Sequence, residues 1–211
     1  GANTSVNFGS GSLDVPAGVH FAVGSAVAPV SALRIGYNNA GGGTSSTAID
    51  FSATNPTFEA RITDELSVGR IADAGWDAAA NGSLVLGSHS LLEVGKVDHL
   101  ANLNVGWNES TGNSGYPSWV NTSAVTGLLD ASQGSLTAHL NQLNIGVSAS
   151  YGTTAGSFVM ATGSSIEANM VNVGMGIGAS GTLRVKGGTL ALVGANTSVN
   201  FGSGSLDVPA G

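Results

Sequence analysis

Residues 143–174 read LNIGVSASYGTTAGSFVMATGSSIEANMVNVG and hold one full period of a pattern that runs through the chain. The stretch opens on Leu143-Asn144-Ile145-Gly146 and closes on the related Val171-Asn172-Val173-Gly174. Between them, Phe158-Val159-Met160 and Ile166-Glu167-Ala168 again alternate apolar with variable residues. This alternation is typical of half-buried β-strands, and the Gly, Ser and Asn between the runs favour turns. The stretch therefore predicts three short strands and a return to the starting point.

The same period recurs outward in both directions. Its opening motif is an apolar residue, a variable residue, then Ile, Val or Phe, then Gly. First strands begin at Val6, Leu33, Leu66, Leu103, Leu143 and Val171, and the motif restarts at Val199. Second strands begin at Leu13, Ile49, Leu84, Leu129, Phe158 and Leu183, and third strands at Phe21, Phe58, Leu92, Leu136, Ile166 and Leu190. The first-strand spacings are 27, 33, 37, 40, 28 and 28 residues, which together make 193.

Repeated units of three short strands predict an all-β fold, a three-sided parallel β-solenoid in which each unit forms one rung. A single rung cannot bury its apolar face, so neighbouring rungs must cover it. Outward residues at equivalent positions then form ladders. Asn104, Asn144, Asn172 and Asn200 share one position and are predicted to hydrogen-bond along the stack. The Gly after each first strand predicts a corner with positive φ or a close backbone approach.

A longer repeat encloses these rungs. The 18 residues Gly1–Gly18 reappear unchanged as Gly194–Gly211, at an offset of 193. We therefore interpret 1–193 as one complete tandem repeat of six rungs, and 194–211 as the start of the next. The expected partner of the chain is itself, in head-to-tail copies. The sequence leaves open whether copies are joined covalently or stack end to end.

Composition narrows the class of protein. The chain of 211 residues has 33 Gly, 42% hydrophobic residues, only 9% charged residues and no Cys. The apolar content argues against disorder, and the Gly content lacks the three-residue period of collagen. A net charge of −7 disfavours nucleic acid as a partner. No apolar run approaches the ~18–20 residues that cross a membrane, so no membrane insertion is expected.

One family resemblance follows from these motifs. The run Gly181–Gly194, GTLRVKGGTLALVG, together with the Leu-Asn-Val/Ile-Gly motifs, resembles bacterial autotransporter-associated β-strand repeats. It also looks like the β-helical passenger domains of haemagglutinin-type adhesins. The resemblance implies a right-handed β-helix, secreted or on the cell surface, that serves in adhesion, biofilm or surface fibres.

The rungs differ in length mainly between the first and second strands. All the Trp and Tyr residues of the chain fall in this region: Tyr37, Trp76, Trp107, Tyr116, Trp119 and Tyr151. Consecutive insertions on a solenoid lie along one edge, so these rings are predicted to form a candidate interaction ridge. Two interpretations compete: the rings fold back as small satellite cores, or some stay exposed and contact a neighbouring chain or a glycan.

Catalytic and metal signals are weak. Asp14 and Asp50 are predicted at neighbouring second-strand positions, where two carboxylates can act as acid and base or bind Ca²⁺. Arg184 precedes Asp207 at that position, which favours a structural ladder of alternating charge. His20, His89, His99 and His139 lack the spacing of a zinc site and are interpreted as outward, solvated residues. No catalytic residue, metal site or cofactor is assigned.

These observations favour a structural protein. The preferred hypothesis is a repeat of a long extracellular filament or stalk, stiffened by stacked rungs and able to pack laterally into thicker fibres. The alternative is a surface adhesin that binds a glycan or host protein through the ridge. A β-helical carbohydrate-active enzyme ranks third, and its test is loss of hydrolysis on replacing Asp14 or Asp50.

Overall fold

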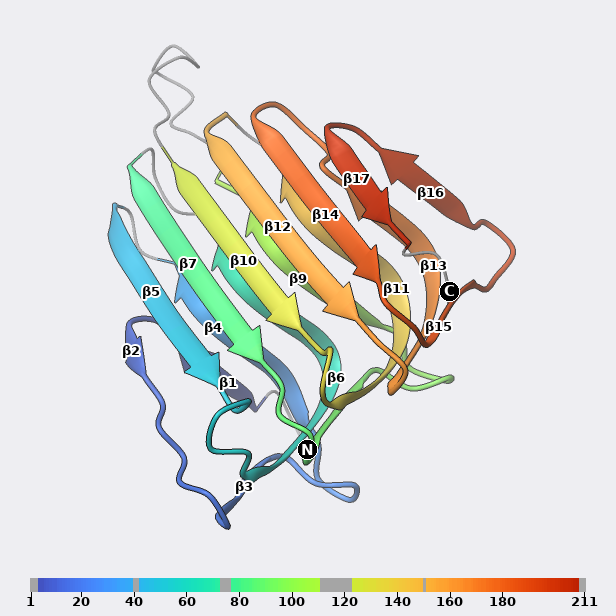
Figure 1. Cartoon of the computed structure of the whole chain (residues 1–211). Coiled ribbons are helices and arrows are strands. Elements are labelled where there is room, and N and C mark those ends of the chain that lie inside the picture. The colour runs from blue at the N-terminus through green and yellow to red at the C-terminus, as the bar shows by residue number, and fades with distance from the viewer. Residues whose placement is uncertain (1–3, 40–41, 73–76, 111–122, 150, 209–211) are drawn as a thin grey trace.

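The computed structural model describes residues 4–39, 42–72, 77–110, 123–149 and 151–208. Within these ranges the chain contains strands and no helix, and its named strands pair in parallel. The strands stack in order into an elongated coil, with one sheet in front and another, strongly bent sheet behind (Figure 1). The predicted three-sided parallel β-solenoid is confirmed, because the bent sheet supplies two sides and the flat sheet supplies the third.

Each side of the coil is a column of equivalent strands. First strands lie in β1 (Ser5–Phe8), β4 (Val30–Asn38), β6 (Thr57–Ile71), β9 (Ala101–Asn108), β11 (Ser135–Ser148), β13 (Ser164–Val173) and β16 (Ser198–Phe201). Second strands are β2 (Gly11–Ser12), β5 (Gly43–Asp50), β7 (Ala78–Val85), β10 (Ala124–Asp130), β12 (Thr153–Met160), β14 (Ala179–Val185) and β17 (Gly204–Asp207). Third strands are β3 (His20–Val23), β8 (Ser90–Val94), β15 (Thr189–Leu192) and the first halves of β6, β11 and β13.

First strands pair in the register that their motif predicts. Val6 lies opposite Leu33, Leu33 opposite Leu66, and Leu66 opposite Leu103. The series continues through Leu143, Val171 and Val199 at the same position. Second strands from Ile49 to Leu206 likewise pair as expected. First and second strands therefore stay in phase although the rungs differ in length.

Third strands depart from the prediction at two steps. Leu92 pairs with Ala60, not with the expected Phe58, and Ile166 pairs with Ala138, not with Leu136. Each error is a slip of two residues. Because side chains alternate with a period of two, such a slip keeps the same residues facing inward, and the sequence pattern cannot distinguish the two registers.

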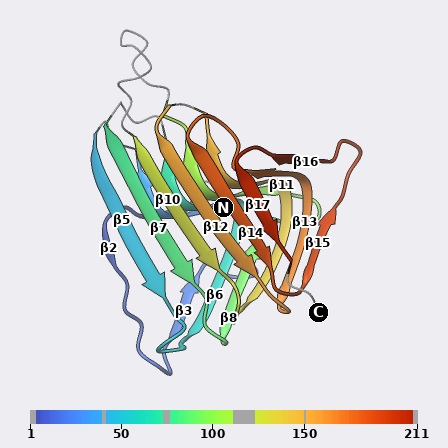
Figure 2. The same ribbon diagram turned by 45° about the horizontal axis from the view of Figure 1, so that its top comes forward.

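Third and first strands are also more continuous than expected. In β6, β11 and β13 the chain passes from one side to the next within a single strand. Figure 2 shows this bent sheet from another direction, behind the flat sheet of second strands. The pairing shifts irregularly between Leu140 and Gln142, and again between Val30 and Ala32, at the bend itself. A bulge of this kind lets a strand turn a corner without a loop.

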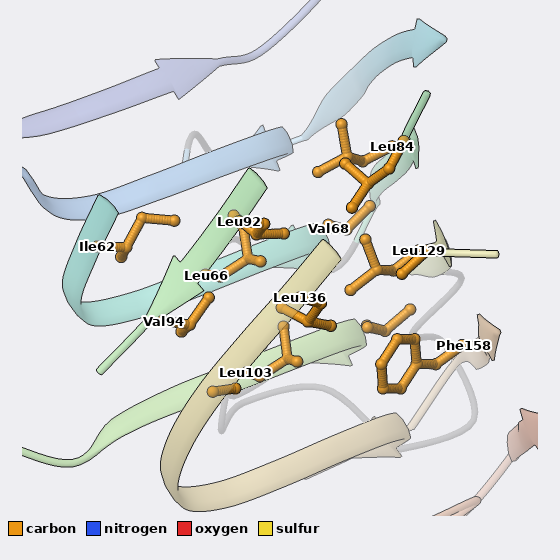
Figure 3. Packing of buried hydrophobic residues seen from close by; sticks show 14 of the residues in the cluster. Ile62, Leu66, Val68, Leu84, Leu92, Val94, Leu103, Leu129, Leu136 and Phe158 are labelled. Atoms are coloured by element: carbon orange, nitrogen blue, oxygen red, sulfur yellow. The ribbon is translucent and has the colours of Figure 1, made fainter. Parts of the chain in front are cut away.

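Inward side chains from all three sides fill one continuous core. Leu66, Leu103 and Leu129 are fully buried, and Leu92 and Phe158 reach the same interior from the third and second sides (Figure 3). Burying a side chain of this size stabilises a protein by about 1.5–3 kcal/mol. A stack of Phe21, Phe51 and Phe58 extends the core toward the first rung, with centroid distances of 4.6–6.4 Å. The core therefore runs along the axis and is shared between rungs.

Two columns of glycine bring the first and second strands into backbone contact, which we call the glycine waist. It comprises Gly36, Gly69, Gly106, Gly146 and Gly174 on first strands, facing Gly82, Gly127, Gly156, Gly181 and Gly204 on second strands. The first-strand members all have φ between 60° and 70°. A Cβ on Gly156 would lie under 3 Å from the Val105 carbonyl oxygen. The predicted positive φ and close approach therefore occur at these five first-side glycines, whereas Gly9, after the first strand of the first rung, shows neither.

Beyond the waist the strands continue and enclose a second, smaller core. It consists of Ile71, Ala78, Ala80 and Val125, all nearly inaccessible to solvent. Its small side chains match the narrow space left where two strands have just separated from backbone contact. A satellite core was one of the two sequence interpretations for this corner, with aromatic rings as its members. The satellite core described here is aliphatic.

Candidate functional site

The aromatic ridge is placed differently from the prediction. Tyr37 and Trp107 were assigned to corner loops, but they lie in β4 and β9, one residue beyond the waist glycines. That assignment is wrong because paired strands continue past the waist. Tyr37 pairs with Arg70, and Arg70 pairs with Trp107, so the two rings share one column two rungs apart. Both rings are partly exposed.

Arg70 links Tyr37 to the rest of this column. Its guanidinium carbon lies 5.8 Å from the centre of the Tyr37 ring, and that of Arg34 lies 5.1 Å from it. Contacts of this geometry are attractive because the ring face is electron-rich. Tyr37 is therefore part of a structural cluster with two arginines on its own surface.

The other ridge residues contribute less to a described surface. Tyr151 is 42% exposed and lies in the corner between β11 and β12. Trp76, Tyr116 and Trp119 lie outside the described residues. The structure thus unites Tyr37 and Trp107 in one column and places Tyr151 outside that column, in a loop between a first and a second strand.

A network of charges sits beside this column on the outer face of the first strands. Glu65 accepts hydrogen bonds from Arg34 at 2.6–3.0 Å and forms an ion pair with Arg70. Arg70 in turn donates to Glu109 at 2.6 and 3.2 Å. Burial by itself would raise the pKa of Glu65, but the hydrogen bonds from Arg34 and Arg70 outweigh it and lower that pKa. Glu65 is thus held as a carboxylate between Arg34 of the preceding rung and Arg70 of its own strand.

The predicted asparagine ladder is confirmed. Asn144 Nδ2 donates to Asn104 Oδ1 at 2.9 Å, and Asn172 Nδ2 donates to Asn144 Oδ1 at 2.8 Å. Asn200 Nδ2 donates to Asn172 Oδ1 at 2.8 Å, and Asn104 Nδ2 donates to Ser67 Oγ at 3.0 Å. Asn104 and Asn144 are buried, so their amides depend on these bonds. The ladder runs parallel to the axis of the coil.

The ladder joins the charge network without a gap. Ser67 donates to Glu65, Glu65 accepts from Arg34, and Arg34 Nη1 donates to Asn7 Oδ1 at 3.3 Å. Polar contacts therefore connect the first-strand column from Asn7 to Asn200. Sequence reasoning found the four asparagines but missed the charged segment, because Arg, Glu and Ser do not repeat at this position.

Of the two acidic residues considered for catalysis, Asp50 has structural contacts, and Asp14 lies beyond the end of β2. Asp50 Oδ1 accepts hydrogen bonds from the Ser52 amide at 2.8 Å and the Ser52 hydroxyl at 2.6 Å. This arrangement closes the turn after β5. Arg184 Nε donates to Asp207 at 2.7 Å, as the alternating-charge interpretation predicted. Within the described residues, no cluster of three or more metal-ligating side chains is present.

Three of the histidines face carboxylates on adjacent rungs. His99 lies 2.6 Å from Asp64, and His139 lies 3.0 Å from Glu167. His20 is 3.7 Å from Glu59.

The described chain also contains no helix long and apolar enough to span a bilayer.

A second corner carries the most exposed apolar side chains. Val27 and Val97 are 95% and 77% exposed, in the loops between β3 and β4 and between β8 and β9. Thr63 and Asp64 lie between these loops, in a shallow groove that Val27 also lines. The exposure of Val27 shows that the tip of the first of these loops is not covered by the described residues. The structure thus presents an apolar edge that the pattern of aromatic residues did not indicate.

Comparison with known proteins adds nothing to this geometry. No family model, curated protein or solved structure matches the chain. The resemblance to autotransporter-associated repeats and haemagglutinin-type adhesins therefore stays a prediction. What the described residues define is a parallel β-solenoid with polar ladders along its outer face.

Proposed function

We propose that the chain is the structural repeat of a long extracellular filament. The observation that carries the proposal is the behaviour of two identical segments. Ser5–Phe8 pairs with β4, and Ser198–Phe201 pairs with β13, each at the first-strand position. The same sequence therefore occupies the same first-strand position at two points that are six rungs apart. At ~4.8 Å per rung, six rungs advance the coil by about 29 Å per repeat.

The mechanical properties follow from the direction of the bonds. Backbone ladders and the asparagine ladder run along the axis, so tension applied to the ends is shared among many hydrogen bonds. The core passes from rung to rung with no linker between them, which favours a stiff rod. The net charge of −7 favours solubility of such a rod.

Electron microscopy of the native material tests this proposal. A smooth rod of one coil's width with an axial period near 29 Å is the expected result. Discrete globules would contradict it. Labelling of intact cells with an antibody against the chain tests the location, and a signal obtained only after lysis would refute an extracellular role.

A surface adhesin is the second candidate. Its support is the partial exposure of Trp107 and the 42% exposure of Tyr151, since such rings can stack on sugars. Saturable binding on a glycan array that Trp107→Ala or Tyr151→Ala abolishes would favour it. Val97→Ser, a change at the opposite corner, is the matched control and should leave such binding unaltered.

A further inference from the structure

The flat sheet of second strands presents three columns of small, uncharged side chains. These residues alternate with buried ones and so point outward, and each is at least partly exposed. The columns are Thr44, Ala79, Ala124 and Thr153; Ser46, Asn81, Thr126, Ala155 and Ser180; and Ala48, Ser83, Leu128, Ser157, Thr182 and Ser205. We call this surface the neutral face.

Charge lies at the rim of the neutral face and on the other two sides of the coil. The charged residues within the second strands all fall in one column, at the edge of the face: Asp50, Asp130, Arg184 and Asp207. The first and third sides carry ion pairs between rungs, such as Arg34–Glu65 and Arg61–Glu93. An uncharged centre with a charged rim is the usual anatomy of a protein–protein interface.

The neutral face carries both a hollow and a knob. The hollow has a volume of about 270 Å³ and crosses three rungs, with Gly82 and Gly127 between its walls of small residues such as Ser46 and Ser83. Leu128, the largest side chain of the three columns, lies at one end of it. A surface that holds a knob beside a hollow can fit a copy of itself about a two-fold axis.

Some polar groups of the neutral face already have partners within the sheet. Thr126 Oγ1 donates to Asn81 Oδ1 at 2.6 Å, and Ser180 Oγ donates to the Thr154 carbonyl at 3.3 Å. A molecule that covers the face does not have to supply these bonds. Covering a polar group that keeps its partner avoids the penalty of an unsatisfied one.

We propose that two coils pack side by side through their neutral faces. The partner is thus a second copy of this chain. Flat sheets of many strands are commonly stabilised by such stacking, and small side chains let the two sheets approach closely. This inference rests on the proposed filament and specifies how filaments associate laterally, since each rod keeps its own width and axial period.

The area of the neutral face is sufficient for a stable pair. Its main strands contain seven or eight residues, a length of about 25 Å. With six rungs spanning about 29 Å, the face covers about 700 Å² on each copy. A standard interface buries about 800 Å² on each partner. Each further repeat adds the same area, so a long array pairs more tightly than one copy.

The response to salt distinguishes this contact from one made by ion pairs. Each chain carries a net charge of −7, so two coils repel each other through solvent. Neutral faces supply no opposing charge attraction, and pairing should therefore strengthen as the NaCl concentration rises. Weakening of the pair by salt would overturn the proposal.

One substitution on the neutral face tests the surface directly. Ser83→Lys places an unpaired charge at its centre and should weaken self-association of the chain about tenfold. Ser165→Lys is the matched control, because it adds the same charge at an exposed position on the third side and should leave association unchanged. Sedimentation equilibrium measures both, and circular dichroism checks that each variant folds. Equal association of the two variants would overturn the proposal.

Thiol labelling locates the contact independently. The chain has no Cys, so one introduced thiol reports on its own surroundings. Ser83→Cys should react with a maleimide more slowly once coils pair, whereas Ser165→Cys should react at one rate throughout. Association without protection of Ser83→Cys would assign the contact to another surface. Protection that arises only when cellulose is added would make the occupant a glycan and the proposal wrong.

Failure of lateral pairing can be distinguished from failure of the filament. If electron microscopy shows single rods and the chain does not pair at any concentration, the neutral-face proposal is wrong and the filament stands. If microscopy shows discrete globules, the proposed filament itself is wrong, whatever the state of association.

Discussion

The glycine waist and the third-strand face differ in how strongly they determine register. At the waist, every step follows the spacing of the sequence motif, because backbone approaches backbone and any added atom would collide. On the third-strand face, two steps slip by two residues with no loss of burial. Contact between main chains thus permits one alignment, whereas alternation of side chains permits several. Substitutions at the waist, in the polar ladders and on the third-strand face can break or sharpen this contrast.

Gly156→Ala should destabilise the chain most, by about 3 kcal/mol. The new Cβ would collide with the Val105 carbonyl and the Gly146 backbone, which cannot move independently. Urea denaturation measures the change. Gly9→Ala is the matched control, because its Cβ would lie 3.6 Å from the nearest atom, and its stability should stay close to that of the parent. Equal effects of the two substitutions would mean that the waist does not determine register.

Glu65→Gln should cost about 2 kcal/mol at neutral pH, because Arg34 and Arg70 lose the charge that compensates them. The pKa of Glu65 lies below its ordinary value of 4.5 in the folded state. Its contribution is therefore fully present above that value and is lost as the pH falls through the lower, folded-state pKa. Denaturation midpoints measured across this acidic range should converge for parent and variant. A constant difference down to the lowest pH would contradict the network.

Asn144→Ala should cost about 1.5 kcal/mol. It removes one donor and one acceptor from the ladder, so the buried Asn104 and the half-buried Asn172 each lose a partner. Asn200→Ala, at the less buried end of the ladder, should cost less by thermal denaturation. A larger loss of stability for Asn200→Ala than for Asn144→Ala would show that the ladder does not stabilise the interior rungs.

Ile62→Val should have the smallest effect, about 1 kcal/mol. Ile62 is buried on the third-strand face, opposite Val94, so valine already fits this column. Differential scanning calorimetry can resolve a loss of this size. A loss of stability as large as that of Gly156→Ala would mean that the third-strand face tolerates substitution no better than the glycine waist.

Much of the fold was predictable because its determinants are local and repeated. The Leu-x-Val-Gly motif specified the first-strand register, and the second strands followed with it. The asparagine ladder was predictable for the same reason, since equal spacing places equal residues on one line. The candidate ridge was less predictable: Tyr37 and Trp107 follow the waist glycines directly, and the sequence could not show that strands continue beyond them.

The charged network and the slipped third strands needed the structure. Glu65 and Arg70 lie on β6 and Arg34 lies on the preceding rung, and the three occupy different positions within their rungs, so no periodicity in the sequence links them. Their contact depends on how the bent sheet packs its outer face. The slip at Ala138 and Ile166 follows the first strands, because β11 and β13 pair at one offset from the third side around the bend to the first side.

By itself, the sequence determined that this chain coils, how many residues each rung contains, and that residues 194–211 restart the series. Repetition makes these properties visible, because each rung must cover the next. The tertiary structure decided how the sides meet: a backbone contact between two glycine columns, a bend within continuous strands, and ion pairs across rungs. These features depend on contacts between segments that are far apart in the sequence, and those contacts form only when the chain has folded into the coil.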